Sequence, residues 1–135
     1  MKKILLALVL VSQSAIAKAE WVAVGRIDAL GGGAVLYVDF FRTRINGHTF
    51  KMWSLMDFKN EQEIEGIKFM SSKFQKEFDC NKKRWRILSS SMFSKNMGNE
   101  EPVQSDNDPD EWKPAEAESL GKAEWGIACR KRPAD

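Results

Sequence analysis

Cys80 and Cys129 are the only two cysteines of the 135-residue chain. Two thiols can pair as a disulfide, ligate a metal together with other residues, or act as reactive nucleophiles. No histidine lies near either cysteine in the sequence, which disfavours a metal site. Because the N-terminus of the chain predicts export into an oxidising compartment, we expect Cys80 and Cys129 to form one structural disulfide.

His48 is the only histidine, so a Ser-His or Cys-His catalytic pair would have to use it. It directly follows Asn46-Gly47, which is the strongest signal for a type I′ turn in the chain, and a side chain at such a turn is normally solvated. The sequence contains no Gly-x-Ser-x-Gly, no phosphate-binding loop and no dinucleotide fingerprint. We therefore expect no enzymatic activity and no cofactor.

An acidic segment near residue 106 has some of the features of a calcium-binding loop. Asp106, Asp108 and Asp110 occupy its first, third and fifth positions. The sixth position, however, is Glu111 instead of glycine, and the twelfth is Ala117 instead of glutamate. The proline and the Asp and Asn side chains of this segment favour consecutive turns. We predict a structural turn without metal, with a weak divalent-cation site as the alternative.

Charge is distributed unevenly along the chain. Residues 68–86 carry a local net charge of about +5, whereas residues 100–118 carry about −7. The four basic residues that follow the first cysteine are the candidate contacts for a binding partner: Lys82, Lys83, Arg84 and Arg86. Strand alternation would place the two arginines on the outer face, with Trp85 packed inward. The alternative is that the two charged segments are solvated faces, or attract each other within the fold.

The N-terminal residues 1–19 predict a cleaved secretory signal peptide. Lys2 and Lys3 precede an unbroken apolar run from Ile4 to Val11, and small residues follow it up to Ala19. That run is much shorter than the ~20 residues needed to cross a membrane. The full chain has 21 basic and 19 acidic residues, and three of the lysines precede residue 20, so residues 20–135 have a net charge of −1. Such a balance argues against nucleic acid as a partner.

Patterns of apolar and turn-forming residues predict an antiparallel sheet followed by a helix. The expected strands cover residues 21–27, 34–39, 42–45, 48–56, 68–80 and 84–93. Charged residues 57–66 and the acidic segment 99–118 are expected to be loops. Ser119 is the expected N-cap of a C-terminal helix that presents Leu120, Ala123 and Ile127 to the sheet. Trp53 and Trp125 are expected in the core, and Trp85 and Trp112 partly exposed.

Several blocks of the sequence resemble the surface-adhesin protein E-like family of Gram-negative bacteria. The blocks cover Lys51–Phe58, Ser71–Cys80, Arg86–Ser90, Asn96–Gly98, Ser105–Pro109 and Trp125–Cys129. The resemblance extends over about residues 20–130, and both cysteines fall where the paired cysteines of the family fall.

The resemblance implies an antiparallel sheet with a C-terminal helix and no catalytic residues. For the founding adhesin it implies binding of host proteins such as vitronectin and laminin from a surface-exposed lipoprotein. No cysteine follows Ala19 that could carry a lipid anchor. The expected location is therefore the periplasm or the cell exterior, with association with the cell surface as an alternative.

Together these observations predict an α+β fold in which an antiparallel β-sheet meander carries a packed C-terminal helix and one disulfide. Residues 1–19 would be the signal peptide and residues 20–135 a single domain. The expected function is non-enzymatic binding of host extracellular matrix or serum proteins by an exported module. The alternative function is a soluble periplasmic domain that binds a small ligand or maintains the envelope.

Overall fold

The computed structural model describes residues 20–28, 32–41 and 43–130. The predicted signal peptide, residues 1–19, lies outside the described residues. Within the described part the elements are β1 (Trp21–Ile27), β2 (Ala34–Asp39), β3 (Thr43–Arg44), β4 (Thr49–Ile64), β5 (Ile67–Asp79), β6 (Arg84–Phe93), the 3₁₀ turn η1 (Asn96–Gly98), β7 (Gln104–Asp106), β8 (Lys113–Pro114) and α1 (Leu120–Ala128).

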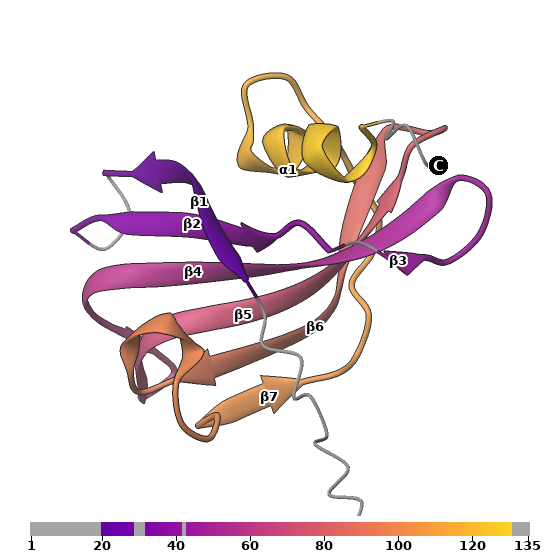
Figure 1. Cartoon of the computed structure of the whole chain (residues 1–135). Coiled ribbons are helices and arrows are strands. Elements are labelled where there is room, and N and C mark those ends of the chain that lie inside the picture. The colour runs from indigo at the N-terminus through magenta and orange to yellow at the C-terminus, as the bar shows by residue number, and fades with distance from the viewer. Residues whose placement is uncertain (1–19, 29–31, 42, 131–135) are drawn as a thin grey trace, which may run out of the picture.

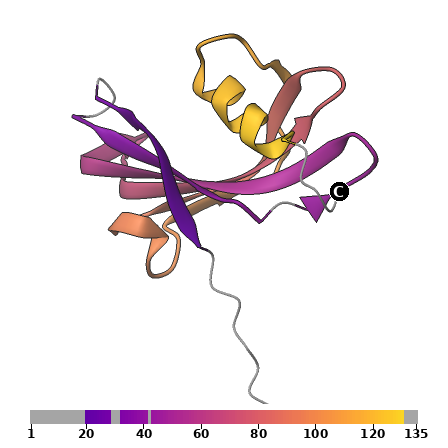
Figure 2. The same cartoon turned by 45° about the horizontal axis from the view of Figure 1, so that its top comes forward.

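The strands form one antiparallel sheet in the order β1-β2-β4-β5-β6-β7 (Figure 1). The short β3 pairs with β4, and the short β8 pairs with β6. Most neighbours in this sheet are also neighbours in the sequence, so the predicted meander is confirmed. Helix α1 packs over the sheet beside the end of the β5–β6 hairpin, as the two views show (Figures 1 and 2). The fold is mostly β, and an antiparallel sheet with one C-terminal helix agrees in outline with the predicted α+β class.

The expectation of a loop over residues 57–66 is wrong, because β4 continues to Ile64 and pairs with the start of β5. The pairing register shifts between Asp57 and Gln62, and this irregularity breaks the apolar–polar alternation that would have marked a strand. The reversal itself is made by Glu65 and Gly66, whose φ angles of 50° and 79° are both positive, as a tight type I′ hairpin requires.

The Asn46-Gly47 turn also differs from the expected type I′ geometry. Neither residue has a positive φ angle. Instead the Asn46 Oδ1 atom accepts hydrogen bonds from the backbone N–H groups of His48 and Thr49, at 3.0 and 3.1 Å. The side chain of Asn46 thus replaces a backbone acceptor and holds a longer loop between β3 and β4.

Two clusters of buried side chains form the core. Val38, Met52, Phe78 and Ala128 lie together between the sheet and α1. At the other end of the sheet, Ala34 packs with Phe58 and Phe69, whose rings meet edge to face with centroids 5.7 Å apart. Trp53 is not a core residue, contrary to expectation. Its side chain lies on the open face of β4 and is 40% exposed.

Helix α1 begins at the predicted residue, but the side of the helix that packs against the sheet differs from the predicted one. The Ser119 hydroxyl accepts a hydrogen bond from the Lys122 backbone N–H at 3.1 Å, which confirms the N-cap. The buried residues are Gly121, Glu124 and Ala128, whereas the predicted Leu120 and Ala123 are exposed. Gly121 explains the difference, because any side chain there would overlap the indole of Trp85. The helix therefore approaches the sheet through its glycine.

Candidate binding site at the hairpin tip

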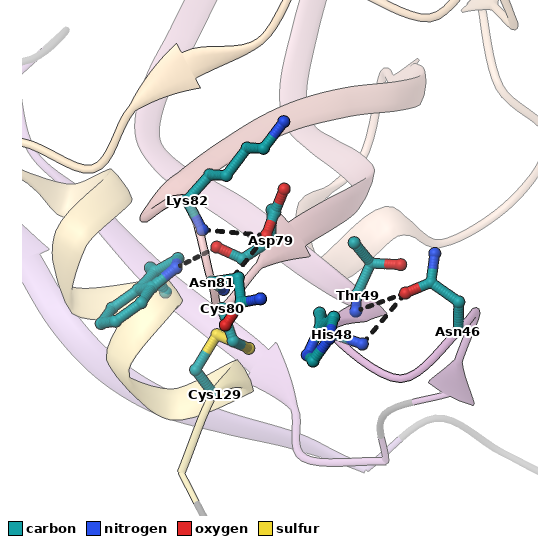
Figure 3. Close-up of a disulfide and its surroundings, with 9 residues drawn as sticks. Asn46, His48, Thr49, Asp79, Cys80, Asn81, Lys82 and Cys129 are labelled. Carbon is teal, nitrogen blue, oxygen red and sulfur yellow. Dashed lines mark hydrogen bonds between the residues drawn. A yellow bond between two sulfur atoms is a disulfide. The ribbon is translucent and has the colours of Figure 1, made fainter.

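The β5–β6 hairpin ends in a four-residue loop, Cys80–Lys83, which confirms the turn predicted there. The Asp79 Oδ1 atom accepts hydrogen bonds from the backbone N–H groups of Asn81 and Lys82, at 3.1 and 3.0 Å (Figure 3). Lys83 closes the loop with a φ angle of 49°. A carboxylate at the end of β5 therefore fixes the backbone that carries the two lysines.

The four basic residues selected from the sequence separate into two kinds. Lys82 and Lys83 are exposed, as expected. Arg84 and Arg86 were expected to be solvated, but they are half-buried and each pairs with a carboxylate. The reason is the register of the hairpin, which places Asp79 opposite Arg84 and Glu77 opposite Arg86.

Both ion pairs use the same atom of the guanidinium group. The Arg84 Nε atom lies 3.1 Å from Asp79 Oδ2, and the Arg86 Nε atom lies 2.8 Å from Glu77 Oε1. Among the contacts of the described residues, the terminal Nη groups of both arginines have no hydrogen-bond partner. Two guanidinium groups are therefore held in place while their terminal donors stay available.

Trp112 brings the acidic segment onto the arginines. The centres of the Arg84 and Arg86 guanidinium groups lie 4.3 and 4.6 Å from the centre of the Trp112 ring, which is cation–π distance. The next residues form β8, which pairs with β6 beside these arginines. The predicted attraction between the acidic segment and the basic hairpin is thus made by an indole ring, whereas the carboxylates that neutralise the arginines come from β5.

A pocket of about 420 Å³ opens at this end of the sheet, and we call it the tip pocket. Its lining combines the two ion pairs and Trp112 with Asn46 and His48 from the loop before β4 and Thr49, the first residue of β4. His48 is exposed, as predicted. The Thr49 side chain is buried, and its hydroxyl has no hydrogen-bond partner among the described residues. A buried hydroxyl without a partner costs free energy.

The Asp79 carboxyl is ionised at neutral pH. Burial raises its pKa, but the backbone N–H of Lys82, the Arg84 side chain and the backbone N–H of Asn81 together lower the pKa to a net value below 3.8. The positive charge of Arg84 acts in the same direction. The negative charge that organises the loop is therefore permanent under physiological conditions.

The predicted disulfide between Cys80 and Cys129 is confirmed, with an S–S distance of 2.06 Å and Cα atoms 5.5 Å apart (Figure 3). Two hydrogen bonds support it. The Trp125 Nε1 atom donates to the backbone oxygen of Asp79, and the Cys80 backbone N–H donates to the backbone oxygen of His48, each at 2.9 Å. The tip is thus tied covalently to α1 and by a backbone hydrogen bond to the loop before β4.

In a comparison with protein families, the chain matches the surface-adhesin protein E family over residues 21–130. This match covers most of the chain. The chain belongs to the surface-adhesin protein E family. No match was found among curated proteins or among solved structures.

Other sequence-based hypotheses for this surface-adhesin protein E domain concern metals and membranes. In the segment 106–112, the Asp106 carboxylate accepts a hydrogen bond from the Asp108 backbone N–H at 2.9 Å, which is a turn of the predicted kind. Within the described residues no group of three or more His, Cys, Asp and Glu side chains is arranged to hold a metal. The described part of the chain also contains no helix with the length and apolarity to span a membrane.

Several residues of the tip pocket were not identified from the sequence of this surface-adhesin protein E domain. Glu77 and Asp79 could have been, because a four-residue turn at 80–83 places them opposite Arg86 and Arg84. Thr49 and Trp112 carry no comparable signal. They reach the pocket from other elements, 30 residues before and 33 residues after Asp79 in the sequence.

Proposed function

We propose that this protein is an exported, non-enzymatic module that binds host extracellular matrix or serum proteins, vitronectin and laminin among them. Membership of the surface-adhesin protein E family supports an adhesin-like role and export to the cell surface or beyond. The proposed contact surface is the hairpin tip with Lys82, Lys83, Arg84 and Arg86. The proposed signal peptide, residues 1–19, would direct the chain through the inner membrane.

The observation that carries this proposal is the rigid presentation of Lys82 and Lys83. Their backbone is fixed by the Asp79 carboxylate, by the Cys80–Cys129 disulfide and by the pairing of β6 with β8. A partner that binds a loop of this kind loses little affinity to ordering it. Exposed lysines on a fixed loop can attract an anionic surface through charge-assisted contacts that weaken as salt rises.

The proposal is tested by reversing the charge of the two exposed lysines. We expect the double variant Lys82→Glu/Lys83→Glu to fold normally, because exposed charges contribute little to stability. Its affinity for immobilised vitronectin or laminin should fall by about tenfold or more at low salt. A tenfold loss corresponds to about 1.4 kcal/mol, which the loss of two charged contacts can readily supply. Biolayer interferometry with the oxidised protein measures the change.

The matched control is the double variant Lys59→Glu/Lys68→Glu, which reverses two exposed lysines at the other end of β4 and β5. It should bind as well as the parent. If the tip variant also bound like the parent, or if the parent bound neither host protein at low salt, the proposal would be abandoned. The arginines are left unchanged in this test, because reversing them would place new carboxylates beside Glu77 and Asp79.

The second candidate function is a soluble periplasmic domain that binds a small ligand or maintains the envelope. The tip pocket supports the ligand-binding form of this hypothesis, because about 420 Å³ is within the range of small-molecule sites. Protease treatment of intact cells separates the two functions. Digestion of the native protein favours the adhesin, whereas complete protection favours the periplasmic domain.

A further inference from the structure

We infer that the tip pocket binds a sulfated sugar unit, such as those of matrix glycosaminoglycans. This inference rests on the proposed function, which makes the hairpin tip the contact surface, and it names the chemical group that the tip would recognise. Three properties of the pocket support it: available guanidinium donors, neutral hydrogen-bonding groups beside them, and two carboxylates at the base.

The cationic side of the pocket is arranged for an oxyanion. The Nε atoms of Arg84 and Arg86 donate to Asp79 and Glu77, at 3.1 and 2.8 Å, and both guanidinium groups lie within cation–π distance of the Trp112 ring. The carboxylates and the indole therefore fix the arginines before any ligand arrives. The Nη groups remain as donors to a sulfate, which matches the preference of arginine for multidentate contact with oxyanions. Lys82 adds a third, exposed cation at the rim.

The neutral side of the pocket suits hydroxyl groups. Asn46, His48 and Thr49 line it, and the buried Thr49 hydroxyl has no partner among the described residues. A hydroxyl can donate and accept at once, as sugar hydroxyls do. The side chains of Asn46 and His48 are exposed and carry polar groups that can form hydrogen bonds with such hydroxyls.

The two carboxylates at the base help to select the ligand. Glu77 and Asp79 are more than nine-tenths buried, and the pKa of Asp79 is lowered, so its charge persists. Carboxylate oxygens accept hydrogen bonds from sugar hydroxyls. They also offset the charges of Arg84 and Arg86, so negative charge alone gives a ligand little affinity for the pocket. The lining therefore favours an anion that also carries hydroxyl groups, as a sulfated sugar does and a peptide of Asp and Glu does not.

Trp112 provides the reporter for the test. The ¹⁵N-labelled, oxidised protein is titrated with a heparin-derived tetrasaccharide, and the Trp112 indole N–H signal is assigned by its loss in Trp112→Phe. We expect a saturable shift of this signal with the sulfated tetrasaccharide. The desulfated tetrasaccharide, inorganic sulfate at equal sulfate concentration and a tetraglutamate peptide should each give at most a weak, unsaturated shift.

Two variants and one control locate the site. Arg86→Lys keeps a cation beside Glu77 but removes the planar fork, and it should weaken tetrasaccharide binding by about tenfold, the value of one charged hydrogen bond. Lys82→Gln changes only an exposed side chain and should weaken binding by about threefold. Lys68→Gln removes the same charge from the far end of β5 and should leave binding unchanged. If Arg86→Lys loses its native spectrum, Lys82→Gln decides the test.

The inference is overturned if the sulfated tetrasaccharide produces no saturable shift, or if inorganic sulfate or tetraglutamate shifts the Trp112 signal equally. It is also overturned if Lys82→Gln binds the tetrasaccharide like Lys68→Gln. Should Lys82→Glu/Lys83→Glu still weaken binding to host proteins by about tenfold or more in those cases, the proposed function stands and only the sugar is wrong. If neither sugar nor host protein depends on the tip, both proposals are wrong.

Discussion

Lys76 and Glu77 are neighbours on β5, yet their side chains leave the sheet on opposite faces and form ion pairs in different surroundings. Lys76 pairs with Glu124 of α1, and Glu77 pairs with Arg86 of β6, with the same N–O distance of 2.8 Å. The Lys76–Glu124 pair is buried, with side-chain exposures of 11% and 2%, and we call it the sealed pair. In the other pair, the Arg86 side chain is 29% exposed.

The sealed pair serves the fold. The Lys76 ammonium lies 5.2 Å from the ring centres of both Phe74 and Trp85, and the second carboxylate oxygen of Glu124 has no partner among the described residues. Charges withdrawn from water to this degree hold one arrangement of helix on sheet, because any displacement would leave each of them unpaired.

In the more exposed Glu77–Arg86 pair, which we call the open pair, the Arg86 Nη groups remain available as donors beside the tip pocket. Both pairs join a basic residue to a carboxylate at the same distance, so their chemistry does not explain the difference. What differs is that α1 covers the Lys76–Glu124 pair, which suits a structural role, whereas the Glu77–Arg86 pair borders the tip pocket, which suits a binding role.

The largest expected effect comes from breaking the sealed pair. Glu124→Gln keeps the shape of the side chain but leaves the Lys76 charge buried and unpaired, which should lower the free energy of unfolding by about 3–5 kcal/mol. Urea denaturation of the oxidised protein measures this loss. The exposed change Glu116→Gln on the preceding loop is the control and should stay within about 0.5 kcal/mol of the parent. A loss below about 1 kcal/mol for Glu124→Gln would contradict a structural role for the pair.

The equivalent change in the open pair should have a smaller effect. Glu77→Gln leaves Arg86 facing a pocket that water can enter, so the free energy of unfolding should fall by only about 1 kcal/mol. The same urea measurement applies. Equal losses for Glu77→Gln and Glu124→Gln would show that coverage of the two faces does not distinguish the pairs.

The smallest expected effect is the pH dependence of the other open pair, Asp79–Arg84. The pKa of Asp79 is lowered in the folded state from 3.8, so its ionised form stabilises the protein fully above pH 3.8. This contribution should disappear as the pH falls below 3.8 and through the lower folded pKa. The difference in urea midpoint between the parent and Asp79→Asn should therefore be constant at neutral pH and shrink in this acidic range. A difference that grows as the pH falls would contradict the lowered pKa.

Local signals predicted much of the fold. The hairpin around Cys80 and the Ser119 N-cap follow from residue types at short spacing, and the disulfide follows from the presence of two cysteines in a chain with predicted export. All three are confirmed. The end of β4 was missed because the irregular register after Asp57 hides its alternation. The buried face of α1 was missed because it is made by Gly121 and by Glu124, neither of which has the apolar side chain that periodicity detects.

The candidate site was predicted only in part. The sequence indicates the basic residues of the tip, and the turn at 80–83 determines which acids lie opposite them. The contact of Trp112 with the arginines depends on how a long loop crosses the sheet edge, and no local pattern encodes that path. Thr49 looks like an ordinary strand residue until the pocket around it is known.

The position of the disulfide in the chain has a consequence for the order of assembly. Ribosomes build the chain from its N-terminus, and the hairpins β1–β2, β4–β5 and β5–β6 join strands that follow one another closely. Cys80 cannot form its disulfide until Cys129 has been synthesised, 49 residues later and just after α1. A chain that stops before residue 129 can complete most of its sheet, but it retains a free Cys80 thiol. A thiol-reactive label would therefore mark molecules that end between residues 80 and 128 and leave each finished, oxidised one unmarked.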